Sequence, residues 1–363
     1  MRFRHNSPQI LLQRLGRSSR LTPLALLALA LVLSVLLVPS LGTTPARAAS
    51  TTTSGNPLAG PWGLYAGPRD SSYLAWQQAT GTNKALLAKI ARRPKVQWFG
   101  SWIPTGSIAA KLQDHIAKSQ NGNPAALTQI AIFREFIGGE GRRSSPITAA
   151  QQSEYRAWID AAARGIGSAR VAMVLEPDLA VGLKGWRPDV RLAMVRYASQ
   201  RFAALPHTTV YLDAGDGDWL TVPAAVSMLK KAGIAYSRGF ALGATHYAST
   251  SLQLGYGRKL VAALAAAGVP NRHFVVDTAD NGRAFTWLQN KAAYPRGDFD
   301  TAPVCRTRTQ LRCVTLGQVP TPTTADPAHA DAYLWFGRAW LYKQADPFVM
   351  SRALGMARTT PYQ

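Results

Sequence analysis

The sequence predicts an α/β fold, a distorted parallel (β/α) barrel of seven strands in a single domain. Two observations predict it. Short, continuous apolar runs, typical of buried parallel strands, alternate with amphipathic helical stretches. Acidic residues follow three of these runs, where barrel enzymes carry their active sites. A doubly wound sheet is the alternative, but no Gly-rich phosphate turn opens any predicted helix.

The predicted elements follow one another with short connections until late in the chain. A long Pro-, Arg- and Thr-rich segment at 291–330 lacks periodicity, and a loop of this length is usually functional. The predicted strands are 96–99, 130–133, 171–175, 209–212, 239–244, 273–276 and 332–336. The predicted helices are 108–118, 149–164, 189–202, 224–231 and 256–267.

The N-terminus has the pattern of a secretory signal peptide, predicted over residues 1–48. Five arginines precede an apolar stretch at 24–38, and small residues in an A-x-A spacing follow. The apolar stretch is about 15 residues, shorter than the roughly 20 of a membrane-spanning helix. An uncleaved anchor is the alternative. We expect a secreted protein with a flexible leader at 49–60 and a catalytic barrel at 61–363.

The chain is strongly basic. Removing residues 1–48 takes away six arginines and no acidic residue, which lowers the formal net charge from +22 to +16. The remaining basic residues are scattered, and no helix-turn-helix, zinc or RNA-binding signature is present, so we expect no nucleic acid partner. A basic surface on an exported protein fits anionic cell-wall polymers. We expect no membrane association after cleavage, and a monomer.

Cysteine and histidine usage argues against a metal site. Cys305 and Cys313 have seven residues between them in a polar stretch, and in an oxidising compartment we expect them to form a disulfide. The six histidines show no HxH or HExxH spacing. We therefore predict no metal and no cofactor. The sequence also lacks the Gly-x-Ser-x-Gly elbow of many esterases.

Three carboxylates lie at equivalent positions, just after the C-terminal ends of predicted strands. They are Asp178 in Glu176-Pro177-Asp178, Asp213, and Asp277. Carboxylates held close together push one pKa up, which leaves a protonated acid beside an ionised base, and glycoside hydrolysis needs such a pair. The alternative is that each Asp caps a following helix. Three together favour a catalytic site.

Several motifs resemble those of the family 6 glycoside hydrolases, which cut β-1,4-glucans. Residues 174–179 (VLEPDL) are similar to the motif whose Asp is the general acid, which would be Asp178. Residues 211–219 resemble an LDAG…W segment in which Asp213 lies at the sugar-binding centre and Trp219 stacks on a sugar. Further similar segments, in the same order, are 98–99 with a sugar-packing Trp98, 155–160, 245–247 with His246 and Tyr247 in place of Asn-Tyr, and 277–282.

The chain departs from the family pattern at two places. The family has a second Asp after the strand that ends at Phe133, and counting back from Tyr155 puts Glu140 near that place, with Glu135 as the second choice. The family's Gly-rich loop near the C-terminus is missing. Trp335 and Arg338 occupy this region as expected substrate-binding residues, and Asp346 lies beyond the expected spacing as a candidate base.

The resemblance implies an inverting β-1,4-glucan hydrolase. Asp178 would protonate the leaving oxygen, Glu140 would position the water, and Asp213 would favour the protonated state of Asp178. Inversion predicts an acid-to-base separation of roughly 6.5–9.5 Å. Two alternatives remain open: a non-catalytic glycan-binding barrel that has lost its base, and a hydrolase for a different glycan.

Overall fold

The computed structural model describes residues 55–134, 146–182 and 187–362, which belong to one compact unit. The predicted signal peptide, the first half of the predicted leader, and the two candidates Glu135 and Glu140 lie outside the described residues. No helix in the described ranges has the length and apolar character needed to cross a membrane.

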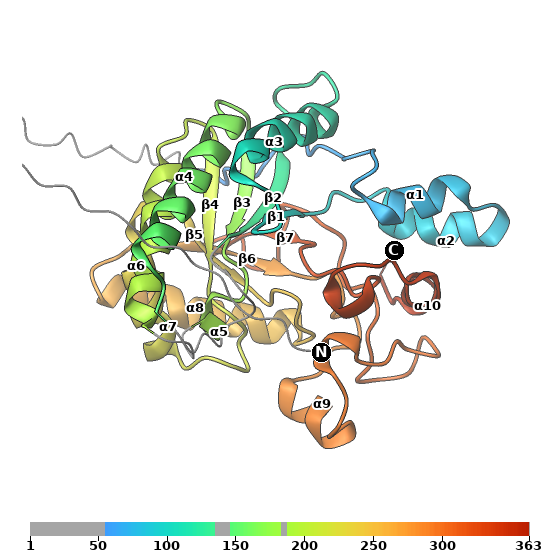
Figure 1. The fold of residues 1–363 in the computed structure, drawn as a ribbon. Helices are drawn as coiled ribbons and strands as arrows, with labels where there is room; N and C mark the ends of the chain where they lie inside the picture. The colour runs from blue at the N-terminus through green and yellow to red at the C-terminus, as the bar shows by residue number, and fades with distance from the viewer. Residues whose placement is uncertain (1–54, 135–145, 183–186, 363) are drawn as a thin grey trace, which may run out of the picture. The chain divides into compact units, whose positions relative to one another are not determined.

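Seven parallel strands pair in sequence order, β1 to β7, and this confirms the predicted fold class (Figure 1). Each predicted strand lies within two residues of an observed one, because buried parallel strands are continuous apolar runs. The last strand is displaced furthest, since the chain leaves the ladder after Leu334. The strands are β1 Gln97–Gly100, β2 Thr128–Phe133, β3 Val171–Leu175, β4 Thr208–Asp213, β5 Gly239–Leu242, β6 His273–Asp277 and β7 Ala330–Leu334.

The barrel is distorted because β1 and β7, the two edges of the sheet, share no strand ladder. Two hydrogen bonds join them instead. The backbone N–H of Val96 donates to the carbonyl of Trp335 at 2.8 Å, and the indole N–H of Trp98 donates to the carbonyl of Phe336 at 2.9 Å. Both acceptors lie just beyond β7, so the segment after β7 is fixed against β1.

Helices cover the outside of the sheet (Figure 1). The five predicted helices are confirmed as α3 Thr105–Gln120, α4 Ala149–Ile166, α6 Pro188–Ala203, α7 Val222–Ala232 and α8 Thr250–Ala266. The remaining α-helices among the described residues are α1 Ser71–Gln78, α2 Gly81–Ala91, α5 Leu179–Gly182, α9 Trp287–Ala293 and α10 Met350–Thr359. Of these, α10 packs against α2.

The core has an outer and an inner layer because side chains alternate along each strand. In β3, Val171, Met173 and Leu175 pack in the large cluster with the helices. Ala172 and Val174 belong to the smaller interior cluster, together with small residues of other strands. The interior between the described strands is therefore filled with side chains.

The predicted long loop contains the disulfide and part of the site. Cys305 and Cys313 are bonded, which confirms the predicted pair, and the backbone N–H of Cys305 donates to the carbonyl of Val314 at 3.0 Å. The loop also carries a short 3-10 helix, Phe299–Thr301. Its residues Asp298, Phe299 and Asp300 line a cavity of about 920 Å³.

Candidate active site

A cavity of about 920 Å³ lies at the C-terminal ends of the strands. Polar residues that follow β3, β4, β5 and β7 line it, so its walls come from segments far apart in the sequence. This is the position at which barrel enzymes bind their substrates. Of the predicted site residues, Trp98, Asp178, Trp219, His246, Arg338 and Asp346 line this cavity.

Asp178 lies in a strained turn directly after β3. Glu176 has φ 53° and Asp178 has φ 65°, a left-handed conformation that costs residues other than glycine about 1–3 kcal/mol each. The short helix α5 begins at the next residue, and the N–H of Val181 donates to the carbonyl of Asp178 at 2.8 Å. The turn therefore has a fixed backbone, and Asp178 lines the cavity.

Glu176 holds this turn in place through hydrogen bonds to neighbouring elements. Its carboxyl group is fully buried and accepts hydrogen bonds from the Tyr155 hydroxyl at 2.9 Å and from the Arg134 N–H at 3.1 Å. Burial raises the pKa of Glu176 to about 8, while the two hydrogen bonds act in the opposite direction. Sequence patterns assign no role to Glu176, because its partner Tyr155 lies 21 residues earlier in the chain, on α4.

Asp213 is fully buried at the end of β4 and does not line the cavity. Its carboxyl group accepts hydrogen bonds from the backbone N–H of Gly215, at 3.2 Å, and from that of Leu179, the residue after Asp178. Burial, and then the negative charge of Asp178, raise the pKa of Asp213 well above its ordinary value. The two carboxyl groups are thus electrostatically linked.

Arg338 brings a positive charge to the same cavity. Its guanidinium lies 4.3 Å from the centre of the Trp98 ring, within the range of a cation–π interaction. Burial lowers the pKa of Arg338 to about 10, while the charges of Asp346, Asp178 and Asp277 oppose this change. Arg338 therefore stays cationic at neutral pH and interacts electrostatically with Asp178 and Asp346.

Asp277, the third carboxylate at a strand end, fastens the neighbouring loops. Its buried carboxyl group accepts hydrogen bonds from the backbone N–H groups of Thr245, Ala279, Phe336 and Gly337. Burial raises the pKa of Asp277 to about 7, and the four N–H donors act against this rise. Asp277 thus fixes the start of the loop that carries Arg338.

Gln344 fastens the same loop at its other end. Its side-chain amide donates to Asp280 at 2.9 Å and accepts from the N–H of Arg338. Gln344 and Asp346 both line the cavity. The positions of Arg338 and Asp346 therefore both depend on the buried pair Asp277 and Asp280.

Two predicted substrate-binding residues do not line the cavity. Tyr247 is fully buried and packs against Phe285 and Phe299. Trp335 is 1% exposed, and its indole N–H donates to the carbonyl of Gln318 at 2.8 Å. We correct our expectation for both: they support the wall of the cavity from the core. The cavity instead has Trp102 and Trp287, which carry no family motif, on its surface.

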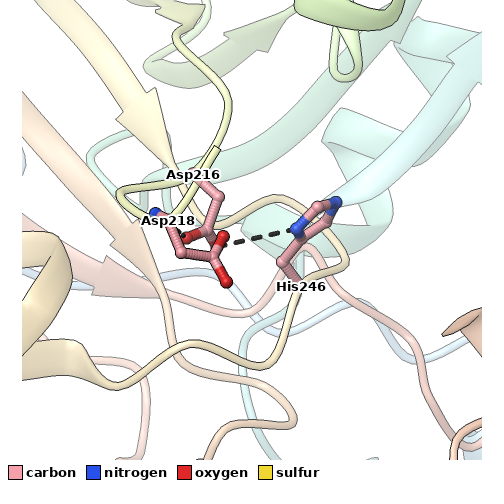
Figure 2. Close-up of side chains that lie close together, drawn as sticks. All are labelled: Asp216, Asp218 and His246. Carbon is pink, nitrogen blue, oxygen red and sulfur yellow. Dashed lines mark hydrogen bonds and ion pairs between the residues drawn. The ribbon is translucent and has the colours of Figure 1, made fainter. Parts of the chain in front are cut away.

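Asp216, Asp218 and His246 lie close together at one side of the cavity (Figure 2). Their potential ligand atoms all lie within 4.8 Å of one another. The His246 ring stacks on Trp219, with ring centres 5.4 Å apart and planes at 6°. Burial lowers the pKa of His246 to about 4, so the ring is neutral at pH 7. Burial and the charge of Asp216 raise the pKa of Asp218 to about 6.

Comparison with known proteins identifies the family of this chain. The family profile described as "Glycosyl hydrolases family 6" matches residues 65–339. Endoglucanase 1 of Streptomyces halstedii is 34% identical over 245 residues, which are 66% of this chain and 73% of that protein. Endoglucanase A of Cellulomonas fimi is 32% identical over 222 residues, which are 61% of this chain and 47% of that protein, so the match spans about half of that relative.

A solved structure also resembles this chain in its fold. The endoglucanase Cel6 of Mycobacterium tuberculosis, in complex with methyl-cellobiosyl-4-deoxy-4-thio-β-D-cellobioside, superposes with a TM-score of 0.66 at 27% identity. The superposition covers 83% of this chain and 98% of that one. The family profile covers well over half of the sequence, and its match confirms the resemblance that the motifs indicated. The chain therefore belongs to glycosyl hydrolases family 6.

Proposed function

We propose that this protein is a secreted hydrolase that cleaves β-1,4-linked glucan with inversion, and that Asp178 is its general acid. The observation that carries the proposal is Asp178 itself, which lines a cavity of about 920 Å³ and acts electrostatically on the buried Asp213. The relatives in family 6 are named as endoglucanases and 1,4-β-D-glucan cellobiohydrolases, which supports glucan as the substrate.

The acid step follows from the carboxylate pair. Two neighbouring carboxyl groups in a buried setting resist carrying two negative charges, so the pair holds one proton near neutral pH. We propose that Asp178 carries this proton when a glucan lies in the cavity, and donates it to the glycosidic oxygen. Asp213, which does not line the cavity, acts as a positioning residue that keeps the proton available.

The base step needs a second carboxylate that activates a water molecule on the face of the sugar ring opposite the general acid. Asp346 lines the same cavity and is our first candidate among the described residues. Glu140 remains the alternative from the sequence. Azide can replace the nucleophilic water: if Asp346 is the base, azide restores turnover to Asp346→Ala and forms a glycosyl azide. If azide instead restores turnover to Glu140→Ala and not to Asp346→Ala, Glu140 is the base.

The aromatic and charged residues of the wall suit a neutral polysaccharide. Trp98, Trp102, Trp219 and Trp287 give the cavity flat apolar faces on which sugar rings stack. We propose Trp98, Trp219, His246 and Arg338 as substrate-binding residues. We further propose that residues 1–48 are removed on export, that the mature protein is a monomer, and that its basic surface adheres to anionic wall polymers. Mass spectrometry of the exported protein and light scattering test the first two.

The test is release of reducing sugar from carboxymethylcellulose, mixed-linkage β-glucan and a panel of other polysaccharides. We expect release from the β-1,4-glucans and a loss of roughly 10²–10⁴-fold in kcat for Asp178→Asn. Asp189→Asn is the matched control, because Asp189 is exposed and does not line the cavity. No release from any glycan, with binding retained, would favour the non-catalytic alternative. Release from another polymer alone would replace glucan as the substrate.

A further inference from the structure

We propose that Asp216, Asp218 and His246 form a binding site for one divalent transition-metal ion, of which Zn²⁺ is the best match. The inference does not depend on hydrolysis, because metal binding is measured without a glycan. Asp216 and Asp218 lie in the loop after β4, and His246 lies in the loop after β5, so the two loops bring the three donors together (Figure 2).

Three buried side-chain atoms in this cluster, each a potential metal ligand, make no hydrogen bond with the described residues. They are Oδ2 of Asp216, Oδ1 of Asp218 and Nδ1 of His246. Asp216 is 1% exposed, and its Oδ2 lies 3.8 Å from Nδ1 of His246. Buried polar atoms are almost always paired, so three unpaired polar atoms that face one another favour a common partner.

A shared proton accounts for only part of this arrangement. One proton between Asp216 and Asp218 would pair the two carboxyl groups but would leave Nδ1 of His246 without a partner. The buried Nδ1 of His246 lies 3.8 Å from Oδ2 of Asp216 and makes no hydrogen bond with the described residues, so as an acceptor it offers a lone pair to a cation. One cation satisfies all three atoms at once.

The donor set favours a borderline transition metal. An imidazole nitrogen and two carboxylate oxygens suit Zn²⁺, whereas Ca²⁺ and Mg²⁺ prefer oxygen ligands alone. Zn²⁺ bonds of about 2.0–2.2 Å in tetrahedral geometry hold their ligand atoms about 3.3–3.6 Å apart. The observed separations are 3.8 Å and at most 4.8 Å, so the ligand atoms would approach one another by up to about 1.5 Å on binding.

The site would connect a metal to the glucan cavity. Asp218 and His246 line the cavity, so the fourth position of a bound ion would open toward it and hold water or a sugar hydroxyl. The ion would also fix the His246 ring on which Trp219 stacks. The sequence predicted no metal because its histidines lack ligand spacing, but these ligands come from two separate loops.

The experiment is a calorimetric titration of the purified protein, without a histidine tag and after dialysis against EDTA, with Zn²⁺. Co²⁺ is the spectroscopic probe, since its visible absorption bands are intense in four-coordinate sites. We expect saturable binding of one Zn²⁺ per chain and no comparable binding of Ca²⁺ or Mg²⁺. His246→Gln and Asp216→Asn should each weaken Zn²⁺ binding at least about tenfold and remove the Co²⁺ bands.

His207→Gln and Asp189→Asn are the controls, because both residues are exposed and lie outside the cluster. They should leave binding unchanged. Circular dichroism verifies that each variant is folded, and if the buried Asp216 tolerates no substitution, His246→Gln decides the outcome alone. Absence of saturable Zn²⁺ binding, or binding that His246→Gln leaves unchanged, would overturn the proposal.

Discussion

Single side chains around Asp178 divide into those that face the cavity and those that support it from below. Asp178, Arg338 and Asp346 line the cavity, whereas Asp213 and Glu176 are fully buried behind it. The sequence motif identifies Asp178, because the Glu-Pro-Asp turn is local. It cannot identify the hydrogen bond between Glu176 and Tyr155, since that contact depends on how α4 packs against β3.

The buried Glu176 makes stability depend on pH. Its folded-state pKa of about 8 lies above the unfolded value of 4.5, so between these values the folded protein holds a proton that the unfolded chain has lost. The free energy of unfolding therefore falls as pH rises from 5 to 8. We expect Glu176→Gln, measured by urea unfolding at both values, to reduce this fall by at least about 1 kcal/mol.

Asp189→Asn is the control for that measurement. The pKa of Asp189 is lowered to about 2 by its hydrogen bond with Arg187, so Asp189 is ionised throughout this range in both states. Asp189→Asn should therefore leave the pH dependence of the free energy of unfolding unchanged. A wild-type stability that is constant or rises between pH 5 and pH 8 would refute the assignment of a raised pKa to the buried carboxyl groups.

At the scale of structural elements, the loop after β7 packs tightly against buried carboxyl groups. A Cβ atom at Gly337 would lie 2.8 Å from Oδ2 of Asp277 and 2.8 Å from Oδ2 of Asp280. We expect Gly337→Ala to lower the free energy of unfolding by about 1–3 kcal/mol, because the buried carboxyl groups must move. Displacement of Arg338 should also reduce glucan hydrolysis. Chemical denaturation and reducing-sugar release measure the two effects.

Gly106→Ala is the matched control for Gly337→Ala. Gly106 lies in the first turn of α3, and a Cβ atom there would have nothing within 4 Å. This substitution should be neutral or should stabilise the protein by about 0.4–1 kcal/mol. If both variants had the same stability and activity as the wild type, the proposed tight fit around Asp277 and Asp280 would be wrong.

For the molecule as a whole, the sequence predicted the seven strands and the disulfide, because apolar runs and cysteine spacing are local signals. It could not predict which side chains near the strand ends turn inward. Tyr247 and Trp335 were expected in the cavity and lie in the core, although their neighbours His246 and Arg338 line the cavity. The cluster of Asp216, Asp218 and His246 was equally beyond sequence reasoning, since it needs two loops to meet.

The most direct test of the central claim compares two substrates that differ in their need for an acid. Cello-oligosaccharides have a poor leaving group that must be protonated, whereas 2,4-dinitrophenyl β-cellobioside has one that leaves without a proton. If Asp178 is the general acid, Asp178→Asn should lower kcat on cellohexaose by roughly 10²–10⁴-fold and affect the dinitrophenyl substrate far less. Equal losses on both substrates, or full activity on cellohexaose, would contradict the account.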